Sequence, residues 1–132
     1  MSVEISEGVK MLFRGKNFGH VATLLPDGSP HSTAVWVDVE GERIVFNSDE
    51  SYVKVKNLRR DPRVTISIID MKSPYTGAMI RGKVVAFRNQ GAREHIDRMA
   101  RKYLGDEQFT HLPNERRVIV EIEPEEIYSP GV

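Results

Sequence analysis

The chain has 132 residues, the usual length of a single domain. Its 19 Lys and Arg residues balance 19 Asp and Glu residues, which argues against a protein that coats nucleic acid or an anionic membrane. The absence of cysteine excludes disulfides, thiolate metal sites and cysteine nucleophiles. No apolar run is long enough to cross a bilayer and the N-terminus does not resemble a secretory signal, so we expect one cytoplasmic domain, residues 1–132.

Most of the predicted elements are strands joined by tight turns. Residues 32–39 form the clearest strand, because apolar residues alternate there with more polar ones. Turn-forming residues at 26–29 and 40–42 join the first three strands closely, which predicts an antiparallel meander. The predicted strands cover residues 19–25, 32–39, 43–48, 63–70, 78–87 and 117–122, and residues 72–77 are predicted as a loop.

Three segments have the 3.6-residue period of a helix instead. Residues 6–14 place their apolar side chains on one face after Ser6, which we expect to cap the helix. Residues 51–60 also begin at a capping residue, Ser51, and residues 92–104 have the strongest helical pattern. The elements together predict a mainly β protein with short helices (α+β). We expect a six-stranded antiparallel barrel, with the longest helix plugging or flanking one end.

The usual signatures of catalysis are missing from the sequence. It contains no Gly-x-Ser-x-Gly elbow, no glycine-rich phosphate loop ending in Lys-Ser/Thr, and no dinucleotide fingerprint. The histidines His20, His31, His95 and His111 are widely spaced, and none belongs to a His-Glu-x-x-His pair. We therefore assign no metal site and no catalytic residue from sequence patterns.

Residues 47–58 predict a site for an anion. A strand ends there at Ser48, and a helix begins near Ser51 with Lys54 in its first turn. Free N–H groups at a helix start bind anions, hydroxyl groups donate hydrogen bonds, and lysine supplies a compact positive charge. This segment is either a phosphate site for a small phosphorylated cofactor or an ordinary capped helix with a solvated lysine. The residues alone leave both interpretations open.

Three other features each have a functional and a structural interpretation. Trp36, on the polar face of its strand and across the hairpin from Asn47, lines a groove or an oligomer interface, or packs under residues 92–104. Arg81 holds a phosphate or carboxylate ligand, or pairs with an acidic residue on a neighbouring strand. The basic run at 54–60 points several ways around a helix in a neutral chain, so we predict no nucleic-acid partner.

Several motifs, in their order along the chain, resemble the pyridoxamine 5′-phosphate oxidase-like family. They are residues 19–24 (GHVATL), residues 27–31 (DGSPH), Trp36 and residues 54–64 (KVKNLRRDPRV), of which the last is the most specific. The resemblance covers about residues 8–128. It implies a six-stranded Greek-key split β-barrel and a homodimer. It also implies a flavin-type cofactor at the subunit interface: FMN, or coenzyme F420 as in the deazaflavin branch.

The resemblance also implies which residues hold the cofactor. Residues 32–37 would run beside the isoalloxazine ring and ribityl chain through backbone groups, and Asn47 and Ser48 would approach the ribityl phosphate, with Lys54 on the phosphate itself. Residues 72–79 and the C-terminal segment would close the site from the partner chain. With Ser51 and Arg81 added from their own patterns, the expected cofactor-binding residues are Ser32, Thr33, Ala34, Val35, Trp36, Val37, Asn47, Ser48, Ser51, Lys54 and Arg81.

Two departures from the family pattern refine the expected activity. Members that oxidise pyridoxamine phosphate carry Arg where this chain has Val53, and they continue beyond the position of Val132. We therefore expect a small dimeric oxidoreductase that moves hydride between its cofactor and an organic substrate, without true vitamin B6 oxidase activity. His20, His31 and Tyr75 are candidates for placement near the ring. The alternative functions are a non-catalytic flavin- or haem-related carrier module and a dimeric interaction barrel without a cofactor.

Overall fold

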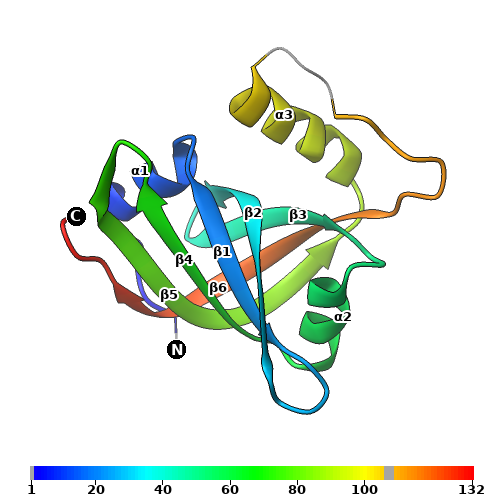
Figure 1. Cartoon of the computed structure of the whole chain (residues 1–132), viewed down its shortest axis with the longest axis horizontal. Coiled ribbons are helices and arrows are strands. Elements are labelled where there is room, and N and C mark those ends of the chain that lie inside the picture. The colour runs from blue at the N-terminus through cyan, green and yellow to red at the C-terminus, as the bar shows by residue number, and fades with distance from the viewer. Residues whose placement is uncertain (1, 106–108) are drawn as a thin grey trace.

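The computed structural model describes residues 2–105 and 109–132, which form a closed six-stranded barrel with three helices around it (Figure 1). The strands are antiparallel to their neighbours, in the order β1-β2-β3-β6-β5-β4 around the barrel. No helix in these two ranges has the length and hydropathy needed to cross a membrane. The elements are α1 (Glu7–Arg14), β1 (Phe18–Leu24), β2 (Pro30–Glu40), β3 (Arg43–Asp49), α2 (Val53–Arg60), β4 (Arg63–Asp70), β5 (Ser73–Arg88), α3 (Ala92–Leu104) and β6 (Arg117–Tyr128).

The predicted fold class is confirmed: the protein is mainly β, and its sheet is a split β-barrel. The first three strands form the predicted meander, since β1 pairs with β2 and β2 pairs with β3. Closure depends on two pairings between strands that are distant in sequence, β1 with β4 and β3 with β6. These pairings close the sheet into a barrel, which removes most of its strand edges.

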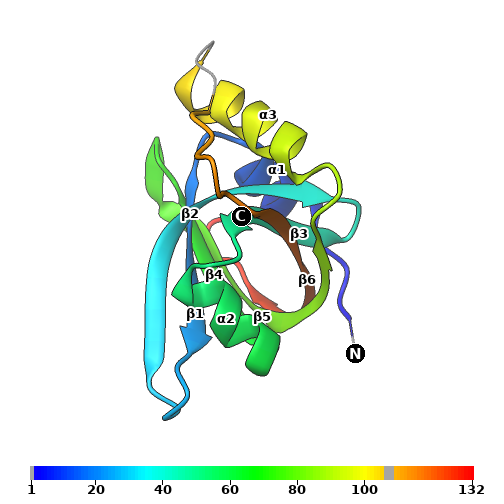
Figure 2. The same cartoon turned by 90° about the vertical axis from the view of Figure 1, so that its right-hand side faces the viewer.

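The barrel is split between β2 and β3. Their ladder extends only from the pair Val37↔Phe46 to the pair Glu40↔Arg43. The rest of β2 stays paired with β1, from Phe18↔Trp36 to Leu24↔Pro30. Beyond their short ladder, β2 and β3 run in different directions (Figure 2). The divergence leaves one edge of β2 open at the place where the candidate site lies.

The barrel interior is a single hydrophobic core that two helices close at opposite ends (Figures 1 and 2). At one end, α1 buries Val9, Leu12 and Phe13, and the Ser6 hydroxyl accepts a hydrogen bond from the Val9 N–H at 3.3 Å, as the predicted cap requires. At the other end, α2 contributes Val55 and Leu58 to the same core (both buried). The 3.6-residue period of these short helices therefore serves to plug the barrel.

The longest helix, α3, lies against the outside of the barrel, over β2, β3 and β6. The Lys102 ammonium donates hydrogen bonds to the carbonyl oxygens of Phe13 at 2.8 Å and Val37 at 2.6 Å. The Tyr103 hydroxyl accepts a hydrogen bond from the Val37 N–H at 3.0 Å and donates one to the Asn17 carbonyl at 2.5 Å. These contacts fix α3 beside the split, so it flanks the barrel and α1 plugs it.

Two predicted boundaries were wrong, and proline and glycine explain both. The predicted loop at residues 72–77 is the beginning of β5, which pairs from Asp70↔Ser73 across a bulge. Gly77 is required there, because a Cβ atom would lie 2.6 Å from the Ile68 carbonyl oxygen. The last strand continues past residue 122 to Tyr128, and Pro124 sits at another bulge. Bulges accommodate residues that otherwise indicate a loop.

Candidate functional site

A cavity of about 310 Å³ lies at the split between β2 and β3. It brings together residues from β1, β2, β3, α2, α3, β6 and the segment that precedes β6, which are distant in sequence. Six of the predicted cofactor-binding residues line this cavity: Ala34, Val35, Trp36, Asn47, Ser48 and Lys54. The other lining residues are Phe18, Tyr52, Ile96, Phe109 and Arg117.

Lys54, in the first turn of α2, is a buried cation of the cavity. Its residue is 9% exposed, and its ammonium nitrogen lies 5.0 Å from the centroid of the Tyr52 ring. Burial lowers the pKa of Lys54, and the positive charge of Arg117 lowers it further. Within the described ranges, no carboxylate forms an ion pair with Lys54. A desolvated cation without a carboxylate partner is costly, and a bound anion would relieve that cost.

Arg117 is the second cation, and sequence analysis missed it. It is 8% exposed at the start of β6, and the pairing Asp49↔Arg117 places it beside the end of β3. Its guanidinium lies 4.9 Å from the Phe109 ring centroid, and its contact with the Glu115 carboxylate is long, at 3.5 Å. Burial lowers the pKa of Arg117. No local pattern distinguishes it from any arginine at a strand end, because only the β3–β6 pairing brings it to Lys54.

Ser48 supplies a hydrogen-bonding group that has no partner. Its side chain is buried, and within the described part of the protein its hydroxyl oxygen makes no hydrogen bond. Buried polar groups are normally satisfied, so an unpaired hydroxyl in a cavity that two cations also line indicates a site for a ligand or water. Two desolvated cations and a free hydroxyl are the groups that bind a phosphate or a similar anion.

The predicted helix cap on α2 was wrong, and this places Ser51 outside the cavity. The residue before α2 is Tyr52, which makes no side-chain cap hydrogen bond. The Ser51 hydroxyl instead donates to the Asp49 carboxylate at 2.6 Å, and the Ser51 N–H donates to the same oxygen at 2.9 Å. This short-range turn satisfies Ser51 locally, so its hydroxyl is already engaged.

Trp36 fulfils both interpretations that its sequence position allowed. It lines the cavity and also packs against the buried residues of α3. Its ring stacks on the Tyr103 ring, with centroids 5.2 Å apart and planes inclined by 5°. The Phe109 ring meets it edge-on, at 6.3 Å and 80°. These ring contacts give the cationic cavity an aromatic wall.

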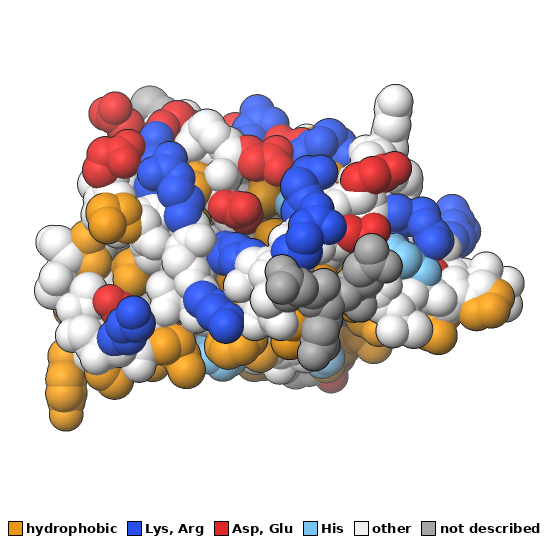
Figure 3. Space-filling view, turned by 90° about the horizontal axis from the view of Figure 1, so that it is seen from above, with side chains coloured by type: hydrophobic (Ala, Val, Ile, Leu, Met, Phe, Trp, Pro, Cys, Tyr) orange, Lys and Arg blue, Asp and Glu red, His pale blue; other side chains and the backbone are white. Residues whose placement is uncertain are grey.

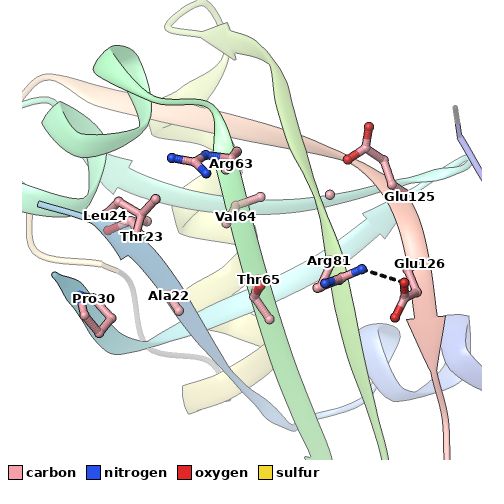
Figure 4. Close-up of a pocket in the computed structure, with 11 residues that line it drawn as sticks. Ala22, Thr23, Leu24, Pro30, Arg63, Val64, Thr65, Arg81, Glu125 and Glu126 are labelled. Atoms are coloured by element: carbon pink, nitrogen blue, oxygen red, sulfur yellow. Dashed lines mark hydrogen bonds and ion pairs between the residues drawn. The ribbon is translucent and has the colours of Figure 1, made fainter. Parts of the chain in front are cut away.

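The remaining predicted site residues lie elsewhere. Ser32, Thr33 and Val37 belong to β2 but do not line the cavity, although the buried Thr33 hydroxyl has no partner among the described residues. Arg81 lines a different cavity, where its guanidinium pairs with the Glu126 carboxylate of β6 at 2.6 Å (Figure 4). The structure therefore shows the ion pair that sequence analysis gave as the alternative for Arg81.

This second cavity is larger, about 500 Å³, and its charged groups are satisfied. It lies over β1, β4, β5 and β6 (Figure 4). Besides Arg81, it includes Arg63, whose guanidinium pairs with the Asp61 carboxylate at 2.8 Å and holds the pKa of that carboxyl at about 2. Glu125 and Glu126 also line it, and their negative charges disfavour an anion.

Most other charged side chains are engaged on the surface. Figure 3 shows basic and acidic side chains interspersed on the face seen from above. In the basic run at 54–60, Arg59 pairs with the Glu50 carboxylate at 2.7 Å and Arg60 donates to the Asn57 amide oxygen at 2.9 Å. His111 lies between the carboxylates of Asp97 and Glu115, which raise its pKa. No group of metal-binding side chains gathers within residues 2–105 and 109–132.

The fold and the cavity define the class: a six-stranded split barrel with a cationic cavity at the split. The family model of pyridoxamine 5′-phosphate oxidase matches residues 5–130. The chain therefore belongs to the pyridoxamine 5′-phosphate oxidase-like family, as its motifs indicated. Comparison with curated protein sequences finds no match.

Solved structures agree with this assignment. An F420 reductase is 28% identical, with a TM-score of 0.82 over 94% of this chain and 98% of that protein. The conserved hypothetical protein Rv2991 from Mycobacterium tuberculosis is 26% identical, with a TM-score of 0.75 over 98% of this chain and 86% of that protein. General Stress Protein 26 from Bacillus anthracis, at 18% identity, has a TM-score of 0.70 over 94% of this chain and 92% of its own; this likeness concerns the fold alone.

Proposed function

We propose that the protein is a small homodimeric oxidoreductase that binds a flavin-type cofactor, FMN or coenzyme F420, at the split of the barrel. The observation that carries this proposal is the pair of buried cations, Lys54 and Arg117, beside the unsatisfied Ser48 hydroxyl. These groups fit the phosphate that both cofactors carry. Membership of the family and the likeness to an F420 reductase support the same class of cofactor.

Each group of the cavity has a distinct part in holding such a cofactor. The Lys54 ammonium and the Arg117 guanidinium neutralise the phosphate charge, and the Ser48 hydroxyl donates a hydrogen bond to it. The edge of β2 that faces away from β1 is open over Ala34–Trp36, so its backbone groups are available to polar atoms of the ligand. The Trp36 and Phe109 rings line the cavity, and apolar surroundings strengthen the charged contacts beside them.

The chemistry itself belongs to the cofactor. When bound, a flavin or deazaflavin supplies hydride transfer, while the protein binds it, orients it and sets the electrostatic environment. No histidine or carboxylate lines the described cavity. We therefore assign the lining residues chiefly to binding and orientation, with Tyr52 and Lys54 the lining side chains that can transfer a proton.

The volume of the cavity supports a dimeric site. Ligand cavities usually enclose roughly 300–1,000 Å³, and about 310 Å³ is at the lower end of that range. We place the phosphate and the adjoining chain of the cofactor in this cavity, with the ring system extending past its mouth. A second copy of the chain would cover the ring and complete the site for a small organic substrate.

The first experiment is a visible spectrum of the purified protein, followed by mass spectrometry of any molecule that heat releases. FMN or F420 is then titrated into the ligand-free protein, with unfolding temperature as a second readout, because a ligand that binds the native state stabilises it. Size-exclusion chromatography with light scattering measures the dimer. Failure of both cofactors to bind would overturn the proposal.

The absence of a histidine or carboxylate from the described lining favours one competing function, a non-catalytic carrier of the cofactor. Turnover distinguishes the two functions. An oxidoreductase transfers electrons from its bound cofactor to an acceptor faster than the free cofactor does, whereas a carrier binds the cofactor without that acceleration.

A further inference from the structure

The side chain of Asn47 lies at the centre of a buried hydrogen-bond network. Its amide nitrogen donates to the Ala92 carbonyl oxygen at 2.8 Å and contacts the His95 Nδ1 atom at 3.0 Å. Its amide oxygen accepts a hydrogen bond from the Arg117 Nε at 2.9 Å. Asn47 thus connects the first turn of α3 to one of the two cations of the cavity.

The network determines the role of each atom in it. An amide nitrogen has two hydrogens, and Ala92 and His95 take both of them. The His95 Nδ1 must therefore accept, which places the proton of its neutral ring on Nε2. Asn47 has no donor left for a phosphate, and its only remaining polar atom is an oxygen that an anion would avoid.

Arg117 keeps donors free for an anion. The contact with Asn47 engages only its Nε, and the contact of its terminal nitrogen with Glu115 is long at 3.5 Å. The other N–H groups of the guanidinium fork can face the cavity. Because a guanidinium is planar, the bond at Nε sets the plane in which those donors lie.

We infer that Asn47 and His95 are positioning residues, which hold the Arg117 guanidinium in the orientation that binds the ligand phosphate and do not contact that phosphate themselves. This inference rests on the proposed function. It changes the role of Asn47 from the predicted ligand to a residue that acts through Arg117. It also gives α3 a part in the site, although only Ile96 of that helix lines the cavity.

The surroundings of His95 keep its ring neutral, as this role requires. Burial lowers its pKa to about 4, and the positive charges of Arg98, Arg88 and Lys102 act in the same direction against the opposing charge of Asp38. The Glu40 carboxylate is the other acidic group facing the ring, 3.8 Å from Nε2. A proton on Nδ1 would confront the Asn47 N–H and break the network.

The test is a double-mutant cycle read with two probes: FMN, and riboflavin, which lacks the phosphate. We expect Asn47→Ala to weaken FMN binding about tenfold and riboflavin binding less than about twofold. In the Arg117→Met background, the same change should weaken FMN binding less than about twofold, because the residue that Asn47 positions is gone. An equal loss in both backgrounds, or an equal loss for both probes, would overturn the inference.

Two further variants keep the test decisive if Asn47→Ala does not fold. His95→Leu removes the acceptor and should weaken FMN binding about fivefold, whereas His95→Asn provides an acceptor oxygen and should restore most of the affinity. Lys102→Met is the matched control, because it removes hydrogen bonds that dock α3 but lies outside the network. It should lower the unfolding temperature and leave FMN affinity within about twofold of wild type.

The outcomes separate this inference from the proposed function. A wild-type protein that neither prefers FMN to riboflavin nor binds F420 would overturn the phosphate site and the inference together. A wild-type preference for FMN that Asn47→Ala and His95→Leu both retain would overturn the inference alone. If Lys102→Met weakens FMN as much as His95→Leu does, the effect comes from the docking of α3, and the positioning role is rejected.

Discussion

The cavity at the split and the cavity over β4 and β5 each contain two cations, and the larger of the two is the poorer candidate for an anion. In the cavity over β4 and β5, Arg63 and Arg81 are exposed, and each pairs with a carboxylate. In the cavity at the split, Lys54 and Arg117 are buried; among the described residues, Arg117 has a long contact with the Glu115 carboxylate and Lys54 has no ion pair. The state of the charged groups, and not the volume, is the reason for assigning the candidate site to the split.

The buried polar groups of the cavity at the split lower the stability of the ligand-free protein. Desolvating a cation without a close partner is unfavourable, as is burying the Ser48 hydroxyl without a hydrogen bond. An exposed ion pair such as Arg81–Glu126 has little effect on stability in either direction. We therefore expect the site at the split to be locally unfavourable in the free protein and to become favourable when an anion binds.

Acid should lower the stability of the protein by protonating His95 beside the split, and this is the largest effect that we expect. The His95 pKa is about 4 in the folded protein and about 6.5 when unfolded, so between these values the unfolded chain binds the extra proton. The free energy of unfolding should fall by about 3 kcal/mol as the pH drops from about 6.5 to about 4. Urea unfolding of wild type and His95→Leu at pH 7 and pH 4.5 measures this contribution. Equal pH dependence in the two proteins would contradict it.

Replacing Lys54 should separate binding from stability. Lys54→Met keeps the apolar stem and removes the charge, and we expect it to weaken FMN binding by about 1.5–3 kcal/mol. The unfolding temperature of the ligand-free variant should equal or exceed that of wild type, because a buried unpaired cation is gone. Equilibrium titration and thermal unfolding measure the two effects. Unchanged FMN affinity would remove Lys54 from the site.

Removing the unsatisfied hydroxyl should have a smaller effect of the same kind. Ser48→Ala deletes one hydrogen-bond donor to the phosphate, and FMN binding should weaken by about 1 kcal/mol. The ligand-free protein should not lose stability, since this hydroxyl has no partner among the described residues. Riboflavin titration is the control, and a loss of riboflavin affinity as large as that for FMN would place Ser48 against another part of the ligand.

The smallest effect should come from the second cavity. Arg81→Met breaks an exposed ion pair, so the free energy of unfolding should change by less than about 0.5 kcal/mol. FMN affinity should stay within about twofold of wild type, because Arg81 does not line the cavity at the split. A larger loss of FMN affinity in Arg81→Met than in Lys54→Met would reverse the assignment of the two cavities.

Local sequence patterns predicted much of the fold and part of the site. Alternation and turn residues determined the meander of β1, β2 and β3, and helical period determined which faces of α1 and α3 are buried. The predicted anion segment places Ser48 and Lys54 at the cavity, because both residues lie near one strand-to-helix connection. Patterns of this kind act over a few residues, and a single sequence displays them directly.

The parts of the site that local patterns did not reveal depend on pairing between distant strands. The β3–β6 register brings Arg117 to the cavity, and the β5–β6 register gives Arg81 its partner Glu126. Arg117 and Arg81, which have similar strand contexts in the sequence, therefore have different roles in the structure. The alternation along a strand determines which face of the sheet a residue occupies. Which strand lies beside that residue depends on how the barrel closes. That closure reflects the packing of the whole core, which no short segment of the chain specifies.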